Sequence, residues 1–341
     1  MQDKNEYQAE LLSNRLSKRF KHLKKWAKRS NVTCYRLYDR DIPEIPLAID
    51  LFQTETELPG ETGDLYVQMA LYERPYEKAE EEESEWLSKM ANAVSYTLAV
   101  PMQNIIIKTR KKQRGELQYE KNSDRNIHFI VKEQGERFLI NLSDYIDTGL
   151  FFDHRPLRAK VRQDAAGKTV LNLFCYTGSF SVYAATGKAK RIDSVDLSGK
   201  YLSWAKKNMK LNGFTDEERY QFIETDVVSW LKKAAAENAT GDALSGTKKT
   251  YDIIILDPPT FSNSKKTETM IDINRDWPEL VKLCLELLNK GGVLYFSTNS
   301  KRLAFDEALL PPDVQSRDIS ASTIPEDFRN TKIHRVWEIT K

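Results

Sequence analysis

The chain has 341 residues, 40% of them hydrophobic, and its 52 basic and 50 acidic residues nearly balance. This length is sufficient for two domains with separate cores, and the aromatic content of 10% excludes a disordered chain. No apolar run approaches the ~18 residues that span a bilayer, so we expect no membrane segment. Three distant cysteines and four scattered histidines predict no disulfide framework and no metal cluster, and they fit a reducing cytoplasm.

The first part of the chain combines helical patterns with short apolar strands. Apolar residues at three- and four-residue spacing predict a helix over 7–29. The other predicted elements are a helix over 80–98, strands over 32–38, 47–52, 65–70 and 104–108, and a hairpin of 128–131 with 137–142. This mixture predicts a smaller α+β domain over residues 1–140, followed by a linker over 141–165.

Two groups of basic residues in this domain are candidates for RNA contacts. They are Lys24 and Lys25 in the first helix, and Arg110, Lys111, Lys112 and Arg114 after the strand 104–108. Clustered cations neutralise the phosphates of a nucleic acid. An ordinary solvated surface explains the same residues, so both interpretations stay open.

From residue 166 onward, short apolar runs alternate with amphipathic helices, which is typical of a parallel sheet covered by helices. Strands are predicted over 169–174, 191–197, 220–225, 251–257, 292–298, 314–320 and 334–340, and helices over 179–186, 200–212, 227–236 and 275–289. We expect Gly213 and Gly291 to end helices and 237–250 to form a loop. The domain 166–341 is therefore predicted to be α/β, with a seven-stranded doubly wound sheet.

A glycine and acidic residues follow successive strands of this sheet, where open α/β sheets bind their ligands. The first strand leads into a loop whose single glycine, Gly178, favours a smaller nucleoside cofactor over a dinucleotide, which needs G-x-G-x-x-G. Asp196 after the second strand suits a ribose diol, and Asp226 after the third suits an adenine amino group. Either acid could instead cap a helix.

The fourth strand ends in the sequence Asp257-Pro258-Pro259-Thr260-Phe261-Ser262-Asn263-Ser264. The two prolines stiffen the loop and remove backbone donors. A carboxylate and an aromatic ring on a rigid loop at a strand end suit a flat base placed beside a cofactor.

Together these motifs resemble the class I S-adenosylmethionine-dependent methyltransferases, and more closely the bacterial 23S rRNA guanine-N7 methyltransferases. The similar segments are 34–39, 108–110, 144–155, 172–178 and 257–265, of which the last is the most specific. The resemblance implies a Rossmann-like C-terminal domain, S-adenosylmethionine as cofactor, 23S rRNA or a ribosomal precursor as substrate, and a cytoplasmic enzyme. In many bacteria this family forms the C-terminal half of a bifunctional enzyme. Because the other half is absent here, we expect the chain to find its rRNA either with its own first domain or with a separate partner that replaces the missing half.

The resemblance also implies roles for individual residues. The expected cofactor contacts are Phe152, Asp153, His154, Phe174, Tyr176, Thr177, Gly178, Ser179, Phe180, Asp196, Leu197, Ser198, Asp226 and Val227. The first three of these would close over the pocket from the linker. The expected catalytic residues are Asp257, Pro258, Pro259, Phe261 and Asn263. Phe261 would stack on the guanine, Asn263 would bond its edge, and Asp257 would stabilise its charge or accept its hydrogens.

Other functions stay open as alternatives. Cytosine carbon-5 methylation needs an attacking thiolate, and no cysteine stands at the fourth or fifth strand end, while Cys175 and Cys284 read as core residues. Guanine N2 must lose a proton, whereas N7 offers a free lone pair that needs only alignment. A non-catalytic RNA-binding assembly factor is disfavoured by acids at successive strand ends.

Overall fold

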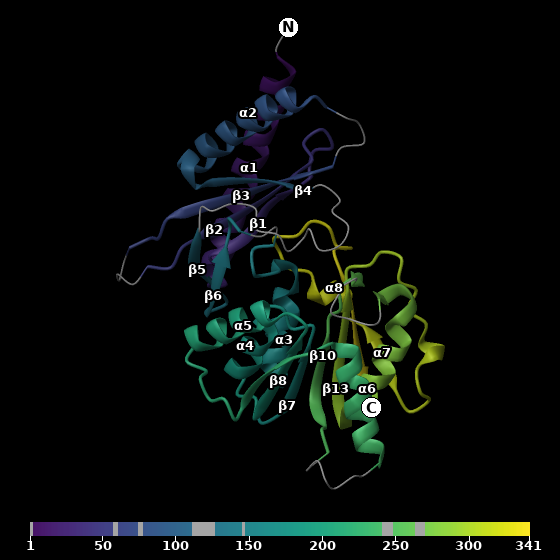
Figure 1. The fold of residues 1–341 in the computed structure, drawn as a ribbon. Helices are drawn as coiled ribbons and strands as arrows, with labels where there is room; N and C mark the ends of the chain where they lie inside the picture. The colour runs from purple at the N-terminus through teal and green to yellow at the C-terminus, as the bar shows by residue number, and fades with distance from the viewer. Residues whose placement is uncertain are drawn as a thin grey trace. The chain divides into compact units, whose positions relative to one another are not determined.

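The computed structural model describes residues 3–56, 61–73, 78–110, 127–144, 147–240, 248–262 and 270–341 (Figure 1). The chain divides into an N-terminal unit, Met1–Phe152 with Glu326–Asn330, and a C-terminal unit, Asp153–Pro325 with Thr331–Lys341. The division between Phe152 and Asp153 falls within the expected linker 141–165. Helix α3 (Arg155–Asp164), which the sequence analysis did not predict, belongs to the C-terminal unit, so 153–165 is part of that fold instead of a connection.

The N-terminal unit is α+β, as predicted. Its four-stranded sheet has the order β1 (Cys34–Asp39), β2 (Leu47–Gln53), β3 (Leu65–Tyr72) and β4 (Ile105–Arg110), with only β3 and β4 parallel. Helices α1 (Lys4–Arg29) and α2 (Glu80–Leu98) share one apolar core with this sheet. A hairpin of β5 (His128–Glu133) and β6 (Glu136–Asn141) completes the unit.

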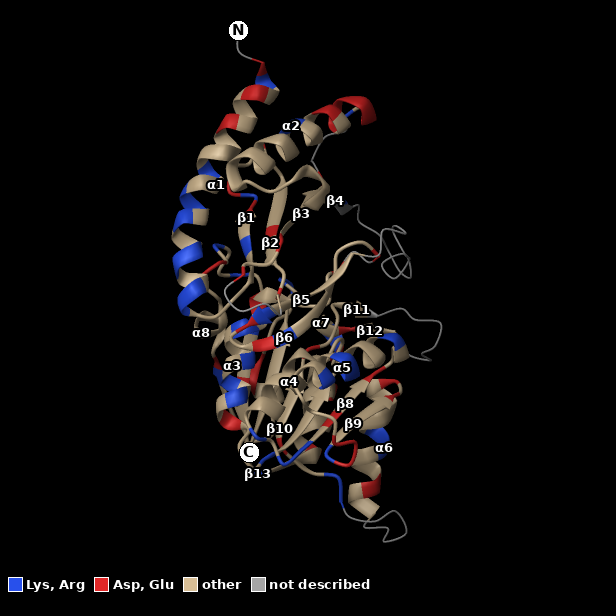
Figure 2. Cartoon of the chain, turned by 90° about the vertical axis from the view of Figure 1, so that its left-hand side faces the viewer, with Lys and Arg blue, Asp and Glu red and all other residues tan. Residues whose placement is uncertain are grey.

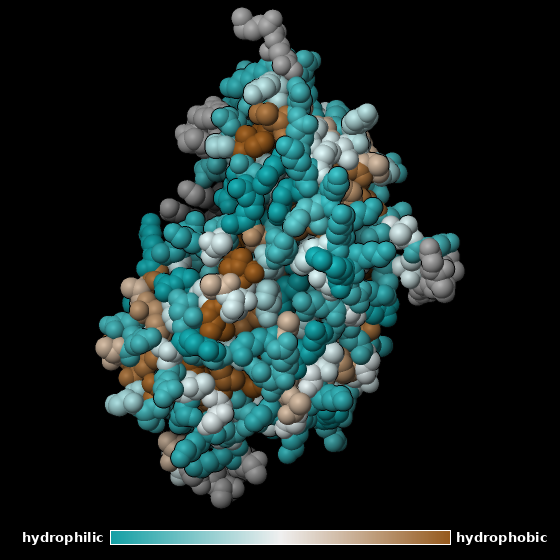
Figure 3. All heavy atoms as spheres, turned by 180° about the vertical axis from the view of Figure 1, so that it is seen from behind, coloured by the Kyte–Doolittle hydropathy of each residue, from teal (hydrophilic) through white to brown (hydrophobic). Residues whose placement is uncertain are grey.

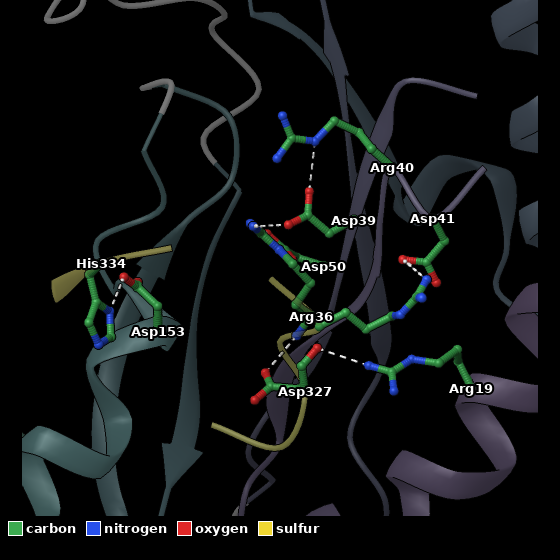
Figure 4. A network of polar contacts seen from close by, with 10 residues as sticks. Arg19, Arg36, Asp39, Arg40, Asp41, Asp50, Asp153, Asp327 and His334 are labelled. Carbon is green, nitrogen blue, oxygen red and sulfur yellow. Dashed lines mark hydrogen bonds and ion pairs between the residues drawn. The ribbon is translucent and has the colours of Figure 1, made fainter. Parts of the chain in front are cut away.

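The segment 326–330 joins this unit through Asp327. The backbone N–H of Arg36 donates to its Oδ2 at 2.9 Å, and the Arg19 guanidinium donates to its carbonyl oxygen at 2.9 Å (Figure 4). The Arg36 guanidinium in turn donates to both carboxylate oxygens of Asp50. These contacts explain why a segment late in the sequence belongs to the first unit.

The C-terminal unit contains the predicted seven-stranded sheet, in the order β14-β15-β13-β10-β7-β8-β9. The strands are β7 (Thr169–Leu173), β8 (Arg191–Asp196), β9 (Tyr220–Glu224), β10 (Tyr251–Leu256), β13 (Leu288–Thr298), β14 (Gln315–Asp318) and β15 (Arg335–Thr340). The helices between them are α4 (Ser179–Thr186), α5 (Gly199–Leu211), α6 (Val227–Thr240) and α7 (Ile273–Leu287). All neighbours from β13 to β9 are parallel, whereas β15 pairs antiparallel with both β13 and β14. The strand order reverses beside β7, which is where such sheets bind ligands.

Several predicted boundaries are wrong. β13 begins at Leu288, so Gly291 does not end α7 but lies inside the strand with a φ of 76°. It lies near the shift in the β10–β13 register between Tyr251 and Ile253. α6 continues to Thr240, into the expected loop 237–250. A two-stranded ribbon of β11 (Phe261–Ser262) and β12 (Ile271–Asp272) was not predicted.

The described helices include none that is both long and apolar enough to cross a membrane. Hydrophilic residues cover most of the face drawn in Figure 3, and they divide its apolar areas into separate patches. Two large apolar side chains near the Asp-Pro-Pro loop in the sequence, Phe261 and Met270, are each 62% exposed. Exposed apolar side chains beside a candidate site are candidates for ligand contact.

Candidate functional site

The loop after β7 forms the first part of the site. Phe174 and Tyr176 have φ values of 53° and 50°, in the left-handed region that residues with a Cβ rarely adopt. Gly178 has a φ of 73°, and a Cβ added to it would lie 2.7 Å from the Cβ of Ala205. The loop thus needs glycine at this position, and it turns directly into α4 at Ser179. Such a tight turn before a helix leaves backbone close to a ligand.

Asp196, at the end of β8, fixes this loop. Its Oδ2 accepts from the N–H of Tyr176 at 2.9 Å, and its Oδ1 accepts from the N–H of Ser198 at 2.9 Å. Burial raises the pKa of the Asp196 carboxyl. Each oxygen has a second lone pair, so the carboxylate can still accept from a ribose diol. Asn208 of α5 ties the same loop by donating to the Thr177 carbonyl oxygen at 2.9 Å.

Asp226 stands after β9 and serves the helix that follows. Its Oδ1 accepts from the N–H of Ser229 at 2.8 Å, which is N-cap geometry for α6. The other carboxylate oxygen is available for the expected contact with an adenine amino group. Val227 is buried, whereas Leu197 and Ser198 after β8 are half-buried, and Ser198 caps α5.

The three residues expected to close over the pocket fall in different units. Phe152 is buried in the N-terminal unit, with its ring centroid 5.5 Å from that of Phe52. Asp153 and His154 belong to the C-terminal unit, where the His154 ring lies 5.9 Å from the buried Phe180 ring. Their contact with a cofactor stays a prediction.

Asp257 follows β10 and is held from two sides within the C-terminal unit. The hydroxyl of Ser297, at the end of β13, donates to its Oδ1. The Nε2 of His154 lies 3.4 Å from its Oδ2. The side chain is nevertheless 29% exposed, so an oriented carboxylate remains open to a substrate. The sequence analysis considered the end of β13 only for the absence of cysteine and did not assign Ser297 a role.

The loop after Asp257 is anchored at its base and exposed beyond it. Pro258 is buried and Pro259 exposed, and the Thr260 hydroxyl donates to the Oδ1 of Asn299 at 2.6 Å. Phe261 then begins β11 with its ring open to solvent. Asn263 lies outside the described residues, so its expected bond to the base stays a prediction.

The predicted RNA-binding groups are described only in part. Lys24 and Lys25 are exposed on α1, where Lys and Arg residues gather along the C-terminal half of the helix (Figure 2). Arg110 ends β4, but its side chain is not described. Lys111, Lys112 and Arg114 lie outside the described residues.

Both cysteines of the C-terminal unit are buried. Burial raises the pKa of the Cys175 and Cys284 thiols, which keeps them protonated near neutral pH. A protonated, enclosed thiol cannot attack a pyrimidine ring. Within the described part of this unit, therefore, no cysteine is suited to carbon-5 methylation.

The expectation that the histidines are scattered is wrong for two of the four. His334 lies beside Asp153 and His154, and one ligand atom from each residue falls within 4.8 Å of the others. The site does not suit a metal ion, because both nitrogens of His334 are hydrogen-bonded, one to Asp153 at 3.1 Å (Figure 4) and the other to Thr323 at 2.9 Å. The two imidazole rings are also stacked, 4.6 Å apart and 9° from parallel, so their lone pairs point along separate planes.

The Rossmann-like sheet has a single-glycine loop after β7, an aspartate after β8 and an Asp-Pro-Pro loop after β10, which is the arrangement expected of a transferase that uses a nucleoside cofactor. Residues 66–312 match the model of the S-adenosylmethionine-dependent methyltransferase family. A relative from Neisseria meningitidis serogroup B, ribosomal RNA large subunit methyltransferase K, is 43% identical over 327 residues, covering 96% of this chain and 86% of the relative. The chain thus belongs to the family of S-adenosylmethionine-dependent methyltransferases that includes methyltransferase K, and its cofactor is S-adenosylmethionine.

Other relatives are longer. Ribosomal RNA large subunit methyltransferases K/L from Pseudomonas fluorescens and Magnetococcus marinus are 43% and 41% identical over 97% of this chain. The chain spans 40% and 43% of their lengths. A solved structure described as an S-adenosylmethionine-dependent methyltransferase from Streptococcus mutans has a TM-score of 0.71 at 23% identity, covering 98% of this chain and 81% of that one, which supports the fold.

Proposed function

We propose that this chain methylates N7 of a guanine in 23S rRNA with S-adenosylmethionine. The relatives' names refer to large-subunit rRNA, and one of them shares 43% identity over nearly the whole chain. The observation that carries the choice of atom and base is the Asp257 carboxylate, held by two neighbours, open to solvent and followed by the exposed ring of Phe261.

The loop after β7 and the acids at the ends of β8 and β9 would hold the cofactor. The absence of a Cβ at Gly178 leaves room for close approach, Asp196 would accept from the ribose, and Asp226 would accept from the adenine. S-adenosylmethionine supplies an electrophilic sulfonium methyl group when it is bound. The chain contributes alignment, which for well-placed reactants accounts for ~7–11 kcal/mol of a barrier.

The loop after β10 would hold the base. Phe261 would stack on the guanine, and Asp257 would accept the N1 and amino hydrogens, which turns N7 to a defined place. N7 already presents a lone pair, so no group is needed to remove a proton first. The positive charge that develops on the ring is stabilised by the same carboxylate. The buried state of Cys175 and Cys284 is consistent with this choice, because no thiolate is required.

The exposed face of α1 would bind the surrounding RNA. Between residues 11 and 29 the sequence contains no acidic residue. The exposed cations in this stretch are Lys18, Lys21, Lys24, Lys25, Lys28 and Arg29. We further propose a single-stranded or flipped target base, since a stacked one cannot enter a site at strand ends. The substrate would be rRNA or a ribosomal precursor in the cytoplasm.

The test is to incubate purified protein with isotope-labelled S-adenosylmethionine and 23S rRNA or ribosomal precursors from a strain that lacks the gene. Digestion to nucleosides and mass spectrometry should yield labelled 7-methylguanosine. Asp257→Asn should abolish most of the product, whereas Asp313→Asn, at an exposed aspartate of the same unit, should not. Labelled 2-methylguanosine or 5-methylcytidine would overturn the assignment to N7.

A further inference from the structure

Two histidines, one stacked on the other, lie next to Asp257 in the C-terminal unit. His154 precedes α3, and its Nε2 lies 3.4 Å from the Asp257 carboxylate. His334 precedes β15, and its ring lies parallel to that of His154. Asp153 and Thr323 hold His334 in turn, and all of these residues belong to the C-terminal unit.

The hydrogen bonds of His334 fix its position. The Thr323 hydroxyl donates to the Ser320 carbonyl oxygen at 2.8 Å, and its oxygen lies 2.9 Å from the Nε2 of His334, within hydrogen-bond distance. The Asp153 carboxylate accepts from Nδ1 at 3.1 Å (Figure 4). His334 is fully buried, and each of its two ring nitrogens has a hydrogen-bond partner, so its ring is fixed in place.

The ring of His154 stacks on that of His334, with its centroid 4.6 Å away, and its centroid lies 5.9 Å from that of Phe180. The side chain of His154 is only 9% exposed, and its Nε2 faces Asp257. Its buried Nδ1 has no hydrogen-bond partner in the described part of the chain. A buried N–H without an acceptor is rarer than an unpaired acceptor. The arrangement therefore favours the tautomer with its hydrogen on Nε2, the nitrogen that faces Asp257.

We propose that His154 is a positioning residue for Asp257. As the Nε2–H tautomer it donates to Oδ2, while Ser297 donates to Oδ1 from the end of the neighbouring parallel strand β13. Two donors from separate elements fix the plane of the carboxylate, and its remaining lone pairs face the substrate. The inference rests on the proposed function for the identity of that substrate, a guanine base. It assigns His154 an action through Asp257 in place of the cofactor contact expected from the resemblance.

Steady-state kinetics and cofactor titration separate these two roles. His154→Leu removes the donor at similar volume, and we expect kcat to fall by about tenfold to a hundredfold, because misplaced groups cost about this much. The Kd for S-adenosylmethionine should stay within about twofold of wild type. His154→Gln keeps an N–H donor and should recover part of kcat, while His128→Gln, at an exposed histidine of β5 in the N-terminal unit, should have no effect. An unchanged kcat with weakened cofactor binding would overturn the proposal.

Nitrogen NMR of the full chain tests the same inference without turnover and without a His154 variant. With ¹⁵N-labelled histidine, His154 should show the Nε2–H tautomer, and Asp257→Asn should shift its resonances. The signals of His22 and His128 in the N-terminal unit should not move. A Nδ1–H tautomer, or indifference to Asp257→Asn, would overturn the positioning role. If the spectra are as expected but the methylated product is not 7-methylguanosine, the proposed function is overturned and the positioning role of His154 is retained.

Discussion

Substituting Gly178 by alanine should damage both the fold and the cofactor site. Gly178 has a φ of 73°, and an added Cβ would lie 2.7 Å from the Cβ of Ala205 and 3.3 Å from its Cα. Real Cβ atoms do not approach so closely, and the obstacle includes the backbone of α5. The loop must therefore move, and it carries the Tyr176 N–H that donates to Asp196.

The size of the effect follows from two separate costs. Alanine in the left-handed region costs about 1–2 kcal/mol. Overpacking a tight contact costs about 1–3 kcal/mol. Gly178→Ala should therefore lower the free energy of unfolding by about 2–5 kcal/mol. Gly167 is a matched control, because its φ is also 73° but nothing lies within 4 Å of an added Cβ. Gly167→Ala should cost only the first part, about 1–2 kcal/mol.

Urea unfolding measures the stabilities of both variants, and calorimetry measures their affinities for S-adenosylmethionine. We expect Gly178→Ala to be the less stable variant and to bind the cofactor more weakly, while Gly167→Ala binds it as the wild type does. Equal losses of stability in the two variants, with cofactor binding intact in both, would refute the close approach of this loop to α5 and its place in the cofactor site.

Two further predictions concern charge. Burial raises the pKa of Asp196, and only its carboxylate form accepts two ribose hydrogens, so affinity for S-adenosylmethionine should fall as the pH drops through a folded-state pKa above the ordinary 3.8. In calorimetry, Asp196→Asn should bind S-adenosylmethionine weakly at every pH. If the affinity of the wild type did not fall at acidic pH, the assignment of Asp196 to the ribose would be contradicted. Replacing Lys24 and Lys25 by glutamate should weaken rRNA binding in filter assays and reduce its salt slope by about 0.7 per lost phosphate contact. The same change at Lys206 and Lys207, an exposed pair on α5, should not.

The sheet and most helices could be predicted because their patterns are strong. β10 is buried at every residue except Asp252, and its residues Ile253–Leu256 form a continuous apolar run, as in parallel strands. α2 begins with four glutamates, which favour a helix N-terminus, and its predicted bounds match Glu80–Leu98. α4 likewise matches its prediction at both ends. In these elements, local preference and tertiary packing agree.

Other elements depend on contacts that the sequence pattern does not show. α3 buries the charged Arg155 and Arg158 beside Leu157 and Val161, so apolar residues alone do not mark its buried face in the sequence. Gly291 was expected to end a helix because a positive φ is common there. A strand with a shifted register can need the same φ, and the sequence does not distinguish the two. The two-residue pairing of β11 with β12 is too short to leave a pattern.

The candidate site also contains residues that the sequence pattern predicts and residues that it does not, and His334 is one of the latter. Residues that follow parallel strands gather at one edge of the sheet, and this rule found Asp196, Asp226 and Asp257. β15 runs antiparallel to β13, with Arg335 opposite Thr298. The residue before β15 therefore reaches the edge where residues after β13 lie. If the rule takes strand direction into account, it also places His334 at the edge of the sheet that holds Ser297 and Asp257. There the ring of His334 stacks on that of His154.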